Sequence, residues 1–148
     1  MSSFGIYART ILPYGLGFLA CGYFTIAAVR TIEYKDHHAT MLARALLLLA
    51  LLLLGILLTP YSVNAVFSWS HTLIAATLFL CELMLAVWFI YLHANTVNWL
   101  LFALQCFGSL LAALSLVNLF DYMLAGQLIT QLAFGAQLDR AVPRIVLS

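Results

Sequence analysis

Three titratable side chains share one helical stripe in the middle of the chain. His71, Glu82 and His93 follow one another at intervals of eleven residues. Eleven residues advance an α-helix by three turns plus about 20°, so one helix would carry all three on the same side. At about 1.5 Å of rise per residue, the two histidines lie about 33 Å apart. If this segment crosses a bilayer, Glu82 falls near the midplane and the histidines at opposite surfaces.

Glu82 is the most unusual of these residues. A carboxylate at the centre of a bilayer costs roughly 2.5 to 3.5 kcal/mol on insertion scales, and no Lys or Arg is expected at a similar depth. Glu82 is therefore protonated, or faces water, or meets a partner subunit. It is either a protonatable residue of a proton or cation pathway, or an acid that ties helices together by hydrogen bonds. Hydrogen-bond partners are expected at similar depth, namely Tyr23 and Thr25, or Gln105 and Ser109.

The histidines offer weaker chemistry. His93 is expected on the same membrane side as His37 and His38, which makes these three a candidate zinc or copper site. The competing interpretation is that they are interfacial histidines at helix ends. Haem ligation would need a second buried histidine facing the first, and no other apolar segment contains one. The sequence therefore predicts no cofactor.

A second polar group is expected at the opposite membrane surface. His71, Asn118 and Asp121 fall at that surface if the chain crosses as described below. They are either a small catalytic cluster or side chains in contact with lipid head groups. The first interpretation would make the protein an enzyme acting on lipid, which is the weakest of the functions considered.

The composition decides the class of protein that must position these residues. Of 148 residues, 66% are hydrophobic and 7% are charged, whereas a soluble domain has about a quarter charged. Such a surface fits lipid and excludes an ordinary soluble domain. The net charge of +1 without a basic cluster argues against nucleic-acid binding.

Hydropathy then locates the helices. A hydrocarbon core of about 30 Å needs about 20 apolar residues, and four segments qualify. We expect an all-α membrane protein, a single domain built as a bundle of four antiparallel transmembrane helices over about 11–29, 41–58, 71–92 and 99–120. A break near Gly126, an interfacial amphipathic helix over about 124–138 and an irregular tail from Asp139 are expected to follow.

Basic residues predict the orientation. The first loop carries Arg30 and Lys35, with Arg44 close by, against Arg9 alone on the N-terminal side. The positive-inside rule then places the first loop in the cytoplasm, with both termini outside.

The leading functional hypothesis is a small non-enzymatic membrane subunit, acting as an accessory, assembly or anchoring component of a larger complex. The segments between spans are short, and no catalytic constellation is recognisable. The expected partners are the lipid bilayer and another membrane protein, or a second copy of the chain. The alternative is a homo-oligomeric transporter or channel in which Glu82 binds a proton or cation.

Overall fold

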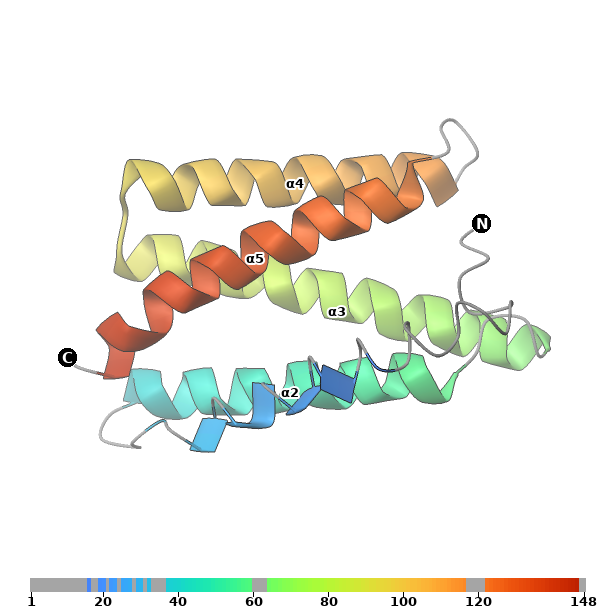
Figure 1. The fold of residues 1–148 in the computed structure, drawn as a ribbon, viewed down its shortest axis with the longest axis horizontal. Helices are drawn as coiled ribbons and strands as arrows, with labels where there is room; N and C mark the ends of the chain where they lie inside the picture. The colour runs from blue at the N-terminus through green and yellow to red at the C-terminus, as the bar shows by residue number, and fades with distance from the viewer. Residues whose placement is uncertain are drawn as a thin grey trace. The chain divides into compact units, whose positions relative to one another are not determined.

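The structure is a computed structural model that describes residues 16, 19–20, 22–23, 25–27, 29–30, 32, 37–59, 64–116 and 122–146. This part of the chain is helical, with short non-helical connections and no strand. Figure 1 shows its four labelled helices. They are α2 (His37–Leu58), α3 (Ala65–Leu92), α4 (Thr96–Leu116) and α5 (Met123–Val146).

Three of these helices, α2, α3 and α4, are long and apolar enough to cross a membrane. The expected all-α class is therefore confirmed for the described residues, with three helices that could span a membrane, and the antiparallel four-helix bundle stays a prediction. The first expected span, 11–29, falls largely outside the described residues, and those described between Leu16 and Arg30 are helical.

Two asparagines mark where helices begin. The Asn64 side-chain oxygen accepts a hydrogen bond from the Phe67 amide at 2.9 Å. Asn95 does the same for the Asn98 amide at 2.9 Å. Both are N-caps, which satisfy a backbone donor left free in the first turn of a helix. As a result α3 and α4 begin a few residues before the apolar segments that predicted them.

The described residues form two compact units that meet at the bond between Cys81 and Glu82, so the continuous helix α3 contributes to both. In the N-terminal unit, α2 and the first half of α3 contact each other near their connection. Ile74 packs 3.3 Å from the position that a Cβ on Gly55 would take. His71 Nδ1 lies 2.7 Å from the Thr59 carbonyl oxygen, and because a carbonyl only accepts, this nitrogen carries the proton.

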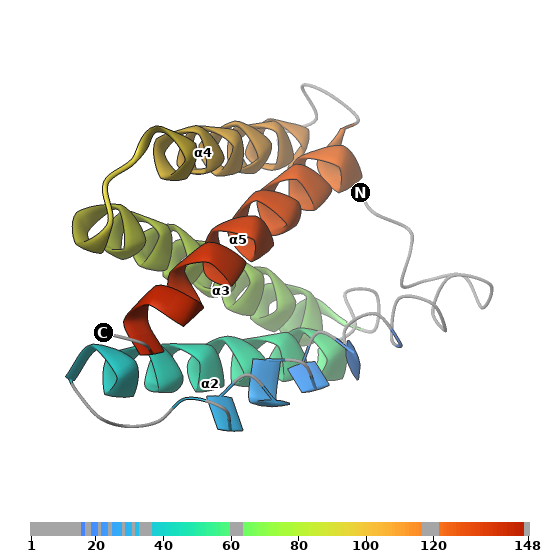
Figure 2. The same cartoon turned by 60° about the vertical axis from the view of Figure 1, so that its left-hand side comes forward.

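In the C-terminal unit, α4 and α5 lie side by side (Figures 1 and 2). Gly108 and Gly126 bring the two backbones together, because a Cβ on either glycine would lie 2.6 Å from a backbone atom of the other helix. Small residues permit such close approach between helices in lipid.

The end of the chain differs from expectation. Tyr122 is not helical and α5 begins at Met123, so the break precedes Gly126, which lies inside the helix. The tail is helical to Val146, with Pro143 inside the helix. The expectation of an irregular tail was wrong because Ala141 and Ile145, on either side of the proline, are both buried, and that packing outweighs the local helix-breaking tendency of proline.

Candidate functional site

The candidate site lies in the C-terminal unit, where polar side chains of α3, α4 and α5 are buried. Glu82 is 3% exposed. Its two carboxyl oxygens each accept a hydrogen bond from Gln131 Nε2 on α5, at 3.0 Å. This bond joins residues 49 positions apart. It ties α3 to α5 through a side chain that the sequence did not predict as a partner.

Thr130, next to Gln131, makes the corresponding contact with α4. Its hydroxyl is fully buried and lies 3.3 Å from the Gln105 carbonyl oxygen and 3.0 Å from the Gly126 carbonyl oxygen. The Ser109 hydroxyl is also within 3.3 Å. Adjacent α5 residues therefore bind two different helices at one level.

A second polar level lies further along α5. Gln137 is fully buried, and its amide nitrogen lies 3.4 Å from the carbonyl oxygens of both Ala86 and Asn98. The Asn98 side chain in turn donates to the His93 carbonyl at 2.9 Å. These contacts connect α5 to the turn between α3 and α4. We call the buried residues Glu82, Asn98, Gln105, Thr130 and Gln137, together with Gln131, the polar seam.

Four atoms of the polar seam have no hydrogen-bond partner within the part of the chain that the structure describes. They are Asn98 Oδ1, both side-chain polar atoms of Gln105, and Gln137 Oε1. A buried polar atom left unpaired costs about 1 to 3 kcal/mol, and in proteins such atoms commonly bind ordered water or an ion. The polar seam therefore contains polar atoms whose hydrogen-bonding capacity the described residues do not use.

The hydrogen-bond partner of Glu82 is not one of the residues expected for it. Ser109 contacts Thr130, and the Gln105 side chain has no partner among the described residues, so Gln131 takes the place expected for them. Tyr23 belongs to the N-terminal unit, where it helps to line an apolar cavity of about 210 Å³ formed with leucines of α2.

The three histidines of the expected metal site belong to different units, and that site stays a prediction. His37 and His38 are exposed at the start of α2, with their rings edge to face at 6.1 Å. His93 follows α3 and is partly exposed. No group of three His, Cys, Asp or Glu side chains among the described residues is arranged to hold a metal ion. Asn118 and Asp121, expected near His71, lie outside the described residues.

Replacing Glu82 separates its hydrogen-bonding role from its acidity. Glu82→Gln keeps an oxygen that accepts from Gln131, so we expect the free energy of unfolding in detergent to change by less than about 0.5 kcal/mol. Glu82→Leu leaves the Gln131 amide unpaired and should lower the free energy of unfolding by about 1 kcal/mol. Denaturation by sodium dodecyl sulfate, followed by circular dichroism, measures both.

A double-mutant cycle with Gln131→Leu provides the control. If the bond stabilises the fold, Glu82→Leu and Gln131→Leu should be coupled by about 0.5 to 1.7 kcal/mol, the range found for hydrogen bonds between membrane helices. Additive effects of the two substitutions would contradict a stabilising bond.

No protein family, no curated protein and no solved structure matches this chain.

Proposed function

We propose that this protein is a non-enzymatic integral membrane subunit that serves as an accessory, assembly or anchoring component of a larger membrane complex. The observation that carries the proposal is the use of its polar groups. In the C-terminal unit, side chains of α5 donate hydrogen bonds to groups on α3 and α4. Polar side chains used in this way stabilise a membrane bundle and form no catalytic constellation.

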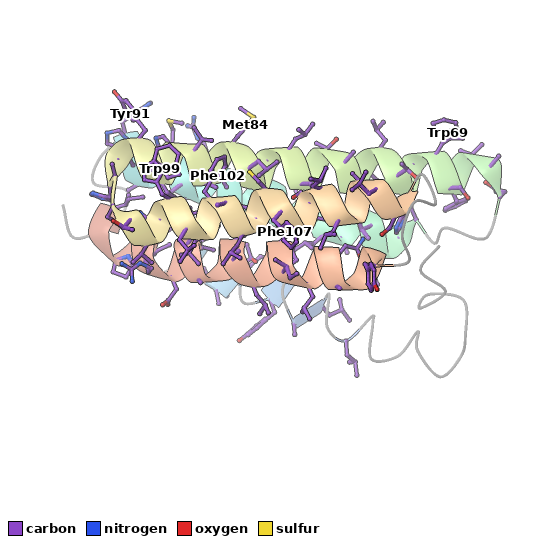
Figure 3. All side chains as sticks on the ribbon, turned by 90° about the horizontal axis from the view of Figure 1, so that it is seen from above. Trp69, Met84, Tyr91, Trp99, Phe102 and Phe107 are labelled. Atoms are coloured by element: carbon purple, nitrogen blue, oxygen red, sulfur yellow. The ribbon has the colours of Figure 1, made fainter. Side chains whose placement is uncertain are left out.

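The outward surface is consistent with a protein that acts within the bilayer. In the C-terminal unit, Met84 and Tyr91 project from one side of α3, and each is more than 70% exposed (Figure 3). Trp99 and Phe107 are exposed on α4. Aromatic residues and methionine are enriched where proteins bind each other. This surface is therefore the one we assign to lipid and to a membrane partner.

The hydrogen bond between Glu82 and Gln131 removes one argument, drawn from the sequence, for a partner protein. From the sequence, a partner's cation would explain a carboxyl group buried without a neighbour. Gln131 now supplies a neutral donor from the same chain. The proposed partner therefore need not place a Lys or Arg beside Glu82, and its contact is assigned to the exposed face of α3.

Purification under mild conditions tests the proposal. The tagged full-length chain is extracted in a gentle detergent, and co-eluting proteins are identified by mass spectrometry alongside the native mass. We expect a larger membrane protein in a fixed ratio. Met84→Arg and Tyr91→Arg should reduce its recovery at least tenfold, because they place a charge on the assigned face.

The matched control is Arg44→Lys, which keeps the charge of an exposed side chain on α2. It should leave recovery unchanged. A homogeneous homo-oligomer with no other protein in a fixed ratio would overturn the proposal.

A second candidate function is a homo-oligomeric transporter or channel that uses Glu82 as a proton-binding or cation-binding residue. The unpaired amide atoms of the polar seam favour it, because buried acids accompanied by hydrated polar groups mark ion pathways in membranes. Proton flux into proteoliposomes discriminates between the two functions. Glu82→Gln should abolish flux if Glu82 carries protons, since an amide does not titrate.

A further inference from the structure

Helix α5 does not qualify as a membrane span by composition, although it is 24 residues long. Polar side chains are spread along the helix, and three of them, those of Thr130, Gln131 and Gln137, make hydrogen bonds to other helices. Thr130 and Gln137 are fully buried. Gln131 is exposed but bonds Glu82 through its amide nitrogen. Three polar residues in the middle of α5 thus have hydrogen-bond partners on α3 or α4, whereas the exposed Asp139 and Arg140 lie toward its end.

The exposed face of α5 has the opposite character. Besides Gln131 and Gly135, it carries Ala125, Leu128, Leu132 and Ala136, with the two leucines 56% and 66% exposed. A helix at the surface of a soluble protein buries its apolar side and exposes its polar side. In α5 the apolar side is outside, which is the arrangement expected of a helix surrounded by hydrocarbon.

The contacts along α5 indicate how deeply this helix lies in the membrane. It runs back along α4 in the opposite direction, and contacts join the two helices at successive levels. The contacting pairs are Ser115 with Tyr122, Gly108 with Gly126, Gln105 with Thr130, and Asn98 with Gln137. These pairs extend over nearly the whole of α4, which is long and apolar enough to cross a membrane. A helix lying in the plane of the surface could not contact α4 at both ends.

We propose that α5 crosses the membrane beside α4 and that its exposed apolar face contacts lipid acyl chains. Its length of about 36 Å exceeds the hydrocarbon thickness of about 30 Å. The bonds of Thr130 and Gln131 place the middle of the crossing level with Gln105 and Glu82. The exposed Asp139 and Arg140 then emerge at the surface where the turn between α3 and α4 lies.

The basic residues support this path. With one crossing each for α2, α3, α4 and α5, the start of α2 and the end of α5 lie at the same membrane face. Arg140 and Arg144 then join Arg44, near the start of α2, at that face. Such concentration of positive charge on one face follows the positive-inside rule, which assigns this face and the C-terminus to the cytoplasm.

Single-cysteine labelling tests the crossing. In full-length protein whose Cys21, Cys81 and Cys106 are replaced by Ala, single cysteines are introduced as Ser62→Cys, Ala94→Cys, Asn118→Cys and Ser148→Cys. Sealed vesicles of one orientation are treated with a membrane-impermeant maleimide before and after permeabilisation. We expect positions 94 and 148 to label together. Positions 62 and 118 should form the opposite group, with at least a tenfold difference between the groups in intact vesicles.

Each other pattern overturns the proposal. If position 148 labels with 62 and 118, α5 stays at the surface that it enters from α4. If position 118 labels with 94, α4 itself does not cross, and the depth assigned to α5 fails with it. Labelling of all four sites to the same extent after permeabilisation is the control for thiol reactivity. The result does not depend on whether the protein has a partner.

Discussion

Gly126→Ala is expected to separate α4 from α5. The added Cβ would lie 2.6 Å from the Ala112 amide nitrogen and from the Gly108 carbonyl oxygen. Both are backbone atoms, so no side chain can rotate away, and the helices must move apart. Overpacking of this kind costs about 1 to 3 kcal/mol and sometimes more. We expect that loss in the free energy of unfolding measured in detergent, and the same direction for Gly108→Ala, whose Cβ would lie 2.6 Å from the Gly126 carbonyl oxygen.

Gly135→Ala is the matched control on the same helix. A Cβ at Gly135 would have nothing within 4 Å, so the substitution only removes the helix penalty of glycine. It should raise stability by about 0.5 to 1 kcal/mol. Equal effects at Gly126 and Gly135 would show that α4 and α5 do not approach as closely as described.

Leu132→Arg is expected to be the most damaging surface substitution on α5. Leu132 is 66% exposed and lies near the level of the Glu82–Gln131 bond. If hydrocarbon covers this face, a central arginine costs about 2.5 to 3.5 kcal/mol on insertion scales. We expect a loss of that size in the free energy of unfolding in bilayer-like bicelles, together with lower yield in the membrane fraction.

Asp139→Arg places the same side chain near the end of α5, where Asp139 is already exposed. Its expected effect is within about 0.5 kcal/mol, as for most substitutions at solvated surfaces. If Leu132→Arg were equally mild, the exposed face of α5 would be in water or at the membrane surface. The pair therefore checks the crossing of α5 by energetics, independently of labelling.

Glu82 shows which part of the candidate site can be predicted from the sequence. Its spacing from His71 and His93 identified a buried carboxyl group, and the structure describes it as 3% exposed. The sequence predicts its partner on the first or fourth expected span. Gln131 lies outside those spans, in a segment whose hydropathy predicts a helix at the membrane surface. Polar residues within an otherwise apolar helix, as at Thr130 and Gln137, were the available signal that this helix packs against others.

Local sequence features are enough to predict a membrane environment and the positions of the principal helices. The apolar lengths of α2, α3 and α4 are local properties, and the cost of exposing them to water is set residue by residue. The N-caps Asn64 and Asn95 are local as well, since each bonds an amide three residues away. Such features are readable from a short window of sequence.

Only the folded structure shows which polar residues contact each other and against which helices α5 packs. The Glu82–Gln131 bond and the Gly108–Gly126 approach join residues far apart in the chain. Whether a glutamine is exposed to lipid or buried against another helix depends on that pairing, and composition counts both cases alike. From its sequence, helix α5 is therefore predicted to be too polar to enter the bilayer. In the structure, contacts with α3 and α4 provide hydrogen-bond partners for Thr130, Gln131 and Gln137.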